Sequence, residues 1–214
     1  QILATMLQKG AKIASCVDTI AKTLPICQER KVAYATFSIL QIFRDGRAYL
    51  VEYDNPSCVF VRDGKIVPYP YTEQVIEDKK IKEYRFQVKE NDCFVLMSDG
   101  VIYAGAGELL NLGWTWESMA EYTLRCTKKT LSASRLAAML SGACNNLYEK
   151  KPGDDTTVVV VRIRKAQIVN LLTGPPSDSQ RDEPMVRSFM ESEGKKVIAG
   201  GSSSNMAARI LRKE

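Results

Sequence analysis

The sequence of 214 residues contains no histidine, and this absence excludes more than any other feature of its composition. Without histidine there is no Ser-His-Asp or Cys-His nucleophile system, no zinc hydrolase site with imidazole ligands and no phosphohistidine chemistry. Any catalysis must therefore use carboxylates, Lys, Arg, Tyr, Cys or backbone groups. Since carboxylate oxygens are ligands for hard divalent cations, the composition points toward metal-assisted chemistry.

Long apolar runs and paired cysteine motifs are also missing. No apolar stretch approaches the roughly 18 residues of a membrane-spanning helix, and no signal peptide is recognisable. None of the six cysteines forms a Cys-x-x-Cys pair, which excludes the usual thiolate zinc sites. We interpret the cysteines as free, small hydrophobic residues in a reducing compartment. We therefore expect a cytoplasmic protein without a membrane partner.

The charged residues are numerous but scattered. Lys and Arg outnumber Asp and Glu by 30 to 25, which gives a formal net charge of +5. The basic residues form no long run, so we expect no nucleic-acid partner. The small basic excess favours an acidic protein partner.

The pattern of apolar residues predicts an α+β protein. Strands are predicted at residues 34–43, 47–53, 58–61, 65–67, 93–97 and 158–163, and helices at 116–126 and 131–148. Residues 73–88 predict one or two exposed strands. Asp45-Gly46 indicates a type I′ turn, and Asp63-Gly64 repeats the same hairpin pattern.

Residues 165–214 differ in character and predict a small C-terminal extension. A strand at 167–172, a helix around 184–190, a strand at 196–199 and a helix at 204–211 give the order β-α-β-α. So short a unit is expected to pack on the main body. Its loop Gly200-Gly201-Ser202 precedes a helix, where backbone N–H groups and the helix dipole suit an anion. The alternative is a serine N-cap with glycines that ease the turn.

Two acidic motifs lie at the ends of apolar strands. Asp99 follows the apolar run 93–97, and Asp154 and Asp155 directly precede the Val-rich run 158–163. If these strands are neighbours and antiparallel, Asp99 and Asp154 converge, and a divalent cation would offset their mutual repulsion. Each motif alone is weak, because Asp-Gly after a strand is usually only a turn.

In this order and context the two motifs resemble those of the metal-dependent protein phosphatases, the protein phosphatase 2C superfamily, and within it the SpoIIE branch. The resemblance rests on Ser98-Asp99-Gly100-Val101 after a strand, two helices, and then Gly153-Asp154-Asp155-Thr156-Thr157 before a strand. It covers residues 1–164, which we expect to form the phosphatase domain, with residues 165–214 as the extension.

The resemblance implies a layered β-sandwich flanked by helices, with two Mn²⁺ or Mg²⁺ ions at one edge. It implies that Asp99 is a ligand of one metal and Asp154 of the other, with Asp155 in a supporting role. Gly100 would let the chain pass close to the site, and the hydroxyl of Thr157 would support it. The implied reaction is hydrolysis of phosphoserine or phosphothreonine by a metal-activated water, in a regulatory phosphoprotein.

The sequence also departs from the family pattern. The resemblance implies further acidic ligands, in a Gly-Asp and then an Asp-Gly motif, and neither precedes the helical pattern at Ile2. We therefore expect weak metal binding and slow hydrolysis from this chain. The rival hypothesis is a non-catalytic phosphatase-like module that recognises a phosphoprotein or a nucleotide. A third is a small-molecule binder that uses the Gly200-Gly201 loop.

Overall fold

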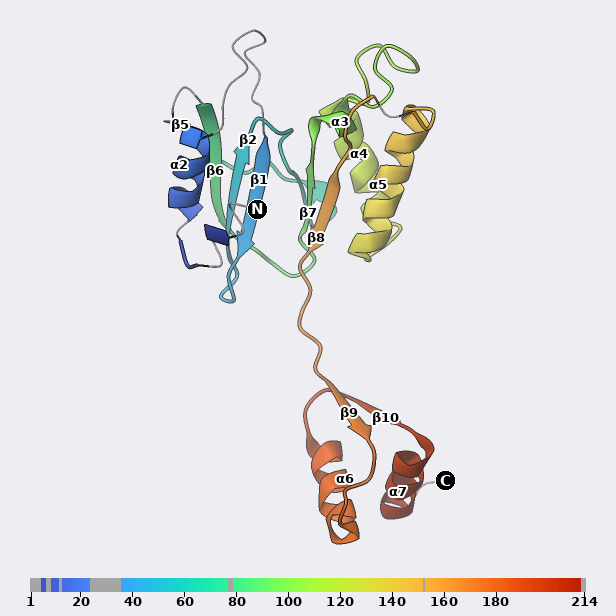
Figure 1. Cartoon of the computed structure of the whole chain (residues 1–214). Coiled ribbons are helices and arrows are strands. Elements are labelled where there is room, and N and C mark those ends of the chain that lie inside the picture. Colours follow the sequence, from blue (N-terminus) through green and yellow to red (C-terminus); the bar gives the residue numbers. More distant parts are fainter. Residues whose placement is uncertain are drawn as a thin grey trace. The chain divides into compact units, whose positions relative to one another are not determined.

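A computed structural model of the chain describes residues 5–6, 9–11, 13–23, 36–76, 79–151 and 153–212. The chain divides into two compact units, Gln1–Arg164 and Lys165–Glu214. Figure 1 labels the helices and strands of each unit, and each unit is described by itself.

The described residues of the first unit form two antiparallel sheets of four strands each. The first sheet has the strand order β1 (Phe37–Ile42), β2 (Arg47–Tyr53), β6 (Lys79–Gln87) and β5 (Thr72–Ile76). Alternate residues of its inner strands face opposite sides. Val51 and Ile81 pack with Val17 of helix α2 (Ile13–Thr23), whereas Leu50 and Tyr84 pack with residues of the second sheet.

The second sheet has the strand order β4 (Lys65–Ile66), β3 (Val59–Arg62), β7 (Cys93–Met97) and β8 (Val158–Arg162). All five residues of β7 are buried, as its continuous apolar run predicts. Phe94 and Leu96 face the first sheet, whereas Val95 and Met97 pack with helices α4 (Trp116–Thr127) and α5 (Ala133–Leu147).

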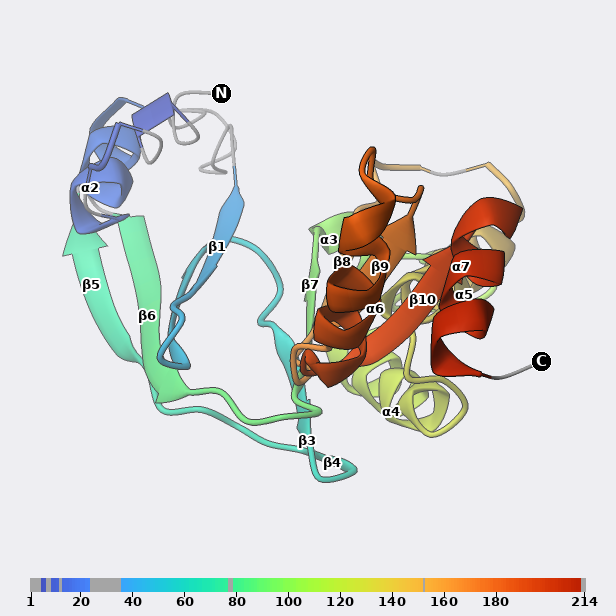
Figure 2. The ribbon, with the colours of Figure 1, turned by 90° about the horizontal axis from the view of Figure 1, so that it is seen from below.

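These layers confirm the predicted fold. Figures 1 and 2 show α2 beside the first sheet and α4 and α5 beside the second, with the two sheets between them. The unit is thus a helix-flanked β-sandwich of the α+β class, and the central core lies where the two sheets face each other.

Of three local predictions, two were wrong and one was confirmed. The segment predicted as exposed strands contains β6, whose residues Ile81 and Tyr84 are buried, because β6 pairs with strands on both sides. Only Gly46 of the Asp45-Gly46 turn has a positive φ, at 82°, so this turn is not type I′. The Asp63-Gly64 turn has positive φ at both residues, 49° and 70°, as type I′ requires.

The second unit contains two parallel strands and two longer helices in the predicted β-α-β-α order, with a short 3₁₀ turn. The elements are β9 (Val169–Thr173), η1 (Ser179–Arg181), α6 (Asp182–Glu191), β10 (Lys195–Ala199) and α7 (Gly201–Leu211). Its small core is formed by Leu172, Val186, Met206 and Ala207. Arg209 of α7 donates to the carboxylate of Asp182 at 2.8 Å and links the two helices.

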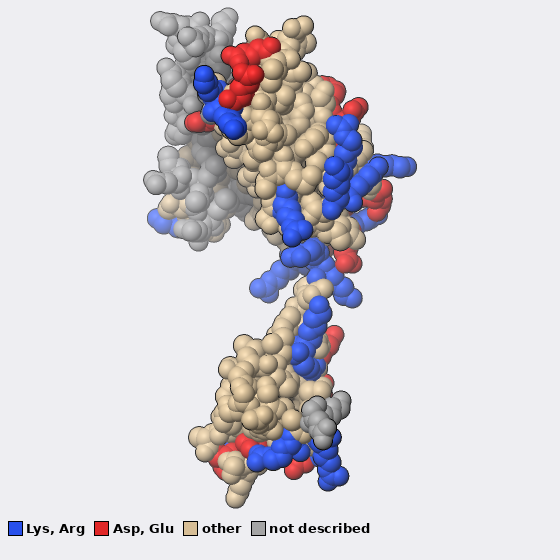
Figure 3. Space-filling view, turned by 90° about the vertical axis from the view of Figure 1, so that its right-hand side faces the viewer, with Lys and Arg blue, Asp and Glu red and all other residues tan. Residues whose placement is uncertain are grey.

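The structure also bears on the expectations about membrane-spanning helices, cysteines and surface charge. No helix among the described residues is long and apolar enough to cross a bilayer. The five cysteines in the described part of the chain are free, and Cys27 lies outside it. On the face that Figure 3 presents, basic and acidic side chains both occur on each unit, among uncharged surface.

Candidate functional site

The two acidic motifs lie beside each other because β7 and β8 are neighbours. The strands pair antiparallel, with Met97 opposite Val158, so the end of one lies next to the start of the other. The two strands are therefore neighbours and antiparallel, which is the condition under which Asp99 and Asp154 were expected to converge.

Ser98 fastens the two motifs together through hydrogen bonds to the opposite strand. Its backbone N–H donates to the carbonyl of Thr157 at 3.1 Å, and its hydroxyl accepts from the N–H of Thr157 at 2.9 Å. The same hydroxyl donates to the carbonyl of Asp155 at 3.0 Å. One side chain thus fixes the register between the residue before Asp99 and the turn that holds Asp154 and Asp155.

Gly100 permits a very close approach of the two motifs. A Cβ atom at this position would lie 2.5 Å from the carbonyl oxygen of Asp155, a distance that no side chain tolerates. The carbonyl of Gly100 accepts a 2.7 Å hydrogen bond from the hydroxyl of Tyr148, just after helix α5. We call the contact between Ser98-Asp99-Gly100 and Asp154–Thr157 the junction. The absence of a side chain at residue 100 is a geometric requirement of this junction.

The carboxylates themselves are differently placed. Asp99 is half-buried at the first residue of the short helix α3 (Asp99–Ile102), and its Oδ1 accepts from the N–H of Gly100 at 3.0 Å. Asp154 is exposed, and its Oδ1 accepts from the N–H of Asp155 at 2.7 Å. Asp155 and Thr157 are also exposed and contribute their backbone groups to the junction.

The hydroxyl of Tyr148 lies close enough to both acidic motifs for their charges to affect its pKa. The pKa of its hydroxyl is raised, first by burial, then by the negative charge of Asp154, with a smaller contribution from Asp99. The two carboxylates, from distant parts of the sequence, thus act on one neighbouring group.

Asp99 also lines a cavity of about 520 Å³ that the first sheet completes. Strand β2 and the loop after it contribute Glu52, Asp54 and Asn55, and β6 contributes Lys80 and Lys82. Both signs of charge therefore surround this space, which we call the charged cavity.

Glu52 is a buried carboxylate that lines the charged cavity, with 2% of its surface exposed. Its Oε2 accepts from the hydroxyl of Tyr84 at 2.8 Å and its Oε1 from the N–H of Cys58 at 2.6 Å. Burial raises the pKa of Glu52, while these hydrogen bonds and the charge of Lys82 act in the opposite direction. Sequence reasoning missed this residue.

Asp99 and Asp154 have the donor chemistry for Mn²⁺ or Mg²⁺, but the described residues do not supply a complete ligand set. Within them, no three His, Cys, Asp or Glu side chains are grouped so as to hold a metal ion. No reaction step is therefore derived through a metal in this structure. Phosphatases of this fold nevertheless depend on such ions in general.

The predicted anion loop lies in the second unit. Gly200 is the N-cap residue of α7, so the alternative of a serine N-cap is wrong. Its carbonyl accepts from both the N–H and the hydroxyl of Ser204, each at 3.0 Å. The space beside Gly200 and Gly201 is open, and Ser202 is exposed.

Sequence reasoning also missed Ser98, Tyr148 and Thr156 as parts of the junction. The hydroxyl of Thr156 lies 3.3 Å from the carbonyl of Asp154 and 3.5 Å from that of Gly100. Ser98 and Thr156 flank the acidic residues in sequence and could have been included on that basis. Tyr148 carried no such signal, because its contact depends on how α5 packs against the sheet.

Comparison with known proteins identifies a family for the first unit. The family model of stage II sporulation protein E (SpoIIE) matches residues 1–164. The phosphatase domain of SpoIIE from Bacillus subtilis has 19% identity and a TM-score of 0.52, covering 78% of this chain and 73% of that chain. No curated protein sequence matches the chain.

Two further solved structures share the fold. The photosystem II phosphatase PBCP has 11% identity and a TM-score of 0.51, with 76% of each chain covered. The RsbU and RsbW domains of Rv1364c from Mycobacterium tuberculosis have 14% identity and a TM-score of 0.53, covering 89% of this chain and 52% of that chain. Identities this low show similarity of fold alone.

Proposed function

Because the chain belongs to the SpoIIE family, with a phosphatase domain of the protein phosphatase 2C type, we propose that it dephosphorylates serine or threonine in a protein. One observation carries the proposal. The Ser98-Asp99-Gly100 and Asp154–Thr157 motifs are held together at one end of the β7–β8 pair by three hydrogen bonds and a glycine contact.

In this proposal Asp99 and Asp154 hold divalent cations, supported by Asp155 and the hydroxyl of Thr157. Mn²⁺ or Mg²⁺ ions, when bound, lower the pKa of water so that it becomes a nucleophile at neutral pH. The chain's own part is to keep both carboxylates in register, which Ser98 and Gly100 achieve. Further ligands are needed beyond those in the described residues.

The charged cavity is the proposed binding site for the phosphorylated residue. Lys80 and Lys82 line it together with Asp99, and a lysine ammonium attracts a phosphate ester as a point charge. Lys80 lies 3.4 Å from a carboxylate oxygen of Glu73, and Lys82 lies over the ring of Tyr71 at 5.2 Å. We propose a phosphorylated regulatory protein as the substrate, and the net charge of +5 favours an acidic one.

The first experiment is calorimetric titration of Mn²⁺ into the chain and its Asp99→Asn and Asp154→Asn variants. We expect saturable binding that either substitution weakens by more than tenfold, the lower end of the loss typical for residues that only support a ligand. Asp63→Asn is the matched control, because Asp63 also precedes a glycine but belongs to the β3–β4 turn. Equal affinity in the chain and both variants would refute the assignment of these carboxylates.

A second measurement addresses the reaction. Release of phosphate from a phosphoserine peptide is followed with Mn²⁺ present, for the chain and for Asp99→Asn. We expect slow release that the substitution abolishes. Binding of the peptide without any release of phosphate would instead favour a non-catalytic phosphatase-like module.

A further inference from the structure

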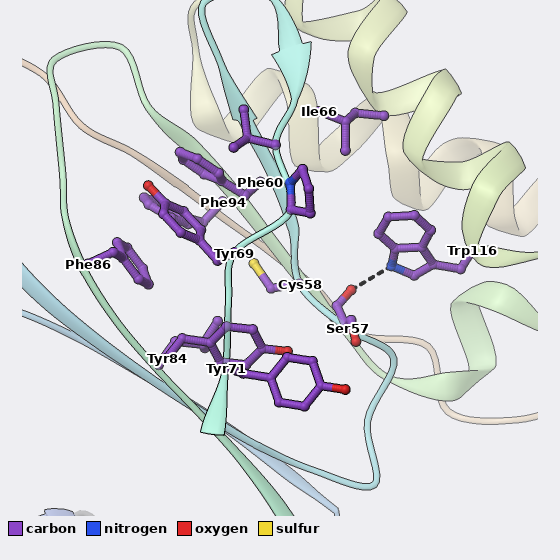
Figure 4. Close-up of a pocket in the computed structure, with 13 residues that line it drawn as sticks. Ser57, Cys58, Phe60, Ile66, Tyr69, Tyr71, Tyr84, Phe86, Phe94 and Trp116 are labelled. Carbon is purple, nitrogen blue, oxygen red and sulfur yellow. Dashed lines mark hydrogen bonds between the residues drawn. The ribbon is translucent and has the colours of Figure 1, made fainter. Parts of the chain in front are cut away.

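A second cavity lies between the two sheets of the first unit, and aromatic side chains dominate its walls. Its volume is about 400 Å³, which is within the range of small-molecule sites. Figure 4 shows rings from both sheets around it, with Phe60 and Phe94 from the second sheet and Tyr84 and Phe86 from the first. We call this space the aromatic cavity.

The rings on one side of the aromatic cavity lie nearly parallel. Phe60 and Phe94 stack with centroids 4.8 Å apart and an interplanar angle of 20°. Tyr69 and Phe86 stack at 4.4 Å and 16°. Phe60 and Phe94 are covered by their neighbours, whereas Tyr69 and Phe86 are half-buried, so a planar molecule can contact these two rings in an offset arrangement.

The opposite end of the aromatic cavity carries a few hydroxyl groups. Figure 4 shows Tyr71, Tyr84 and Ser57 there, with the indole of Trp116 beyond them. The Trp116 N–H donates to the carbonyl of Ser57 at 2.7 Å, so it is already used. The hydroxyl of Tyr84 donates to Glu52, which leaves its oxygen able to accept a hydrogen bond.

Among the described residues, none of those that line the aromatic cavity is charged. A charged molecule would lose its hydration there without an ionic partner, which is costly. Water fills such a space poorly, since each molecule needs about two to four polar partners.

We propose that the aromatic cavity binds a small, neutral, planar aromatic molecule that carries one hydrogen-bond donor. The half-buried rings of Tyr69 and Phe86 contact the molecule, and the hydroxyl oxygens of Tyr71 and Tyr84 accept from its donor. Tyr71 is 49% exposed and stands at the entrance. The site is separate from the carboxylates of the β7–β8 junction and does not depend on the proposed phosphatase activity.

Indole is the probe for the test, because it is planar and neutral and has one N–H donor. Calorimetric titration of indole into the full chain is expected to show saturable binding with one site. Indole-3-carboxylate has the same ring with a negative charge and is expected to bind at least about tenfold more weakly. Absence of saturable indole binding up to its solubility limit would overturn the proposal, as would equal affinity for the anion.

Three substitutions test whether indole binds in the aromatic cavity. Cys58→Phe fills the centre of the cavity and is expected to abolish binding, provided that thermal unfolding shows a folded protein. Val67→Trp, at the wall where the side chain is only half-buried, narrows the cavity with less risk to the core. Tyr71→Phe keeps the shape and removes one acceptor, so a loss of about threefold to tenfold is expected.

The matched control is Tyr103→Phe. Tyr103 is 55% exposed and lines the charged cavity, so its loss of a hydroxyl should leave indole binding unchanged. Indole binding that survives both filling variants unchanged, or that Tyr103→Phe reduces as much as Tyr71→Phe does, would show that indole binds elsewhere and would overturn the proposal.

Discussion

The charged cavity and the aromatic cavity both include residues from the same two strands of the first sheet, but they differ in lining. Ionic side chains line the charged cavity, whereas aromatic and apolar side chains dominate the aromatic cavity. On β6, Lys80 and Lys82 line the charged cavity, and Tyr84 and Phe86 line the aromatic one. These four residues are spaced by two, so they share one face of the strand. Strand β2 repeats the division with Leu50 in the aromatic cavity and Glu52 in the charged one.

The register of the two strands aligns these halves. Glu52 pairs with Lys82 and Leu50 pairs with Tyr84. A single step of two residues along each strand thus changes the environment from apolar to ionic. The two halves thus differ in role: the aromatic half stabilises the sandwich and lines the proposed indole site, and the charged half lines the proposed phosphatase site.

The largest expected effect tests the aromatic half. Phe94→Ala removes a fully buried ring that stacks on Phe60, and truncation of a buried Phe typically costs about 3–5 kcal/mol. The free energy of unfolding, measured by urea denaturation, is expected to fall by that amount. Val75→Ala is the control, because Val75 is 63% exposed and its loss should cost less than about 0.5 kcal/mol. Equal losses would refute the assigned role of the aromatic half.

A smaller effect on stability, with a larger one on the site, is expected at Gly100. In Gly100→Ala the new Cβ would clash with the carbonyl of Asp155, and such crowding typically costs about 1–3 kcal/mol. We also expect weaker Mn²⁺ binding, since the two motifs must separate. The control is Gly142→Ala in helix α5, where nothing lies near the new Cβ and a gain of about 0.5–1 kcal/mol is expected. A Gly100→Ala protein of unchanged stability would show that the junction is not as tight as described.

Ser98→Ala tests the junction through hydrogen bonds alone. The substitution removes the bonds that the hydroxyl makes with the N–H of Thr157 and the carbonyl of Asp155. Each net hydrogen bond contributes about 0.5–1.5 kcal/mol, so the free energy of unfolding should fall by roughly 1–2 kcal/mol. Ser141→Ala, on the exposed surface of α5, should change it little. If Mn²⁺ affinity is unaffected while stability falls, Ser98 is structural only.

The sequence predicted the acidic junction better than the cavities, for a physical reason. Asp99 and Asp154 are marked by local patterns, since each borders a strand whose apolar run is visible in the sequence. Ser98 and Gly100 belong to the same short segments. The pairing of β7 with β8 then follows from the fold that the motifs resemble.

The cavities depend on packing between sheets, which no local pattern encodes. Residues 73–88 contain alternating charges, so the segment resembled exposed strands, although β6 is paired on both sides. Its lysines and aromatics occupy one face, and only the facing second sheet shows that this face is partly buried. Glu52 was missed for the same reason, because a buried carboxylate is recognised only by its partners.

The smallest expected effect concerns Glu52, where the two halves meet. Its pKa is raised above the ordinary value of 4.5, chiefly by burial, so the folded protein holds this proton more tightly than the unfolded chain does. The stability contributed by Glu52 is therefore greatest at low pH and falls as pH rises from about 4.5 to the raised pKa. Above that value the loss is constant.

Glu52→Gln should remove this pH dependence. Each unit of pKa shift corresponds to about 1.4 kcal/mol, so the free energy of unfolding of the variant, relative to the natural chain, should rise as pH increases from 4 to 7. Urea denaturation at each pH measures this difference, and Glu121→Gln on exposed α4 surface is the matched control for loss of one charge. A difference that stays flat, or falls, would mean that Tyr84, Cys58 and Lys82 stabilise the Glu52 carboxylate fully. Glu52 would then act in the charged half as a stabilised carboxylate, held by the hydroxyl of Tyr84 and the N–H of Cys58.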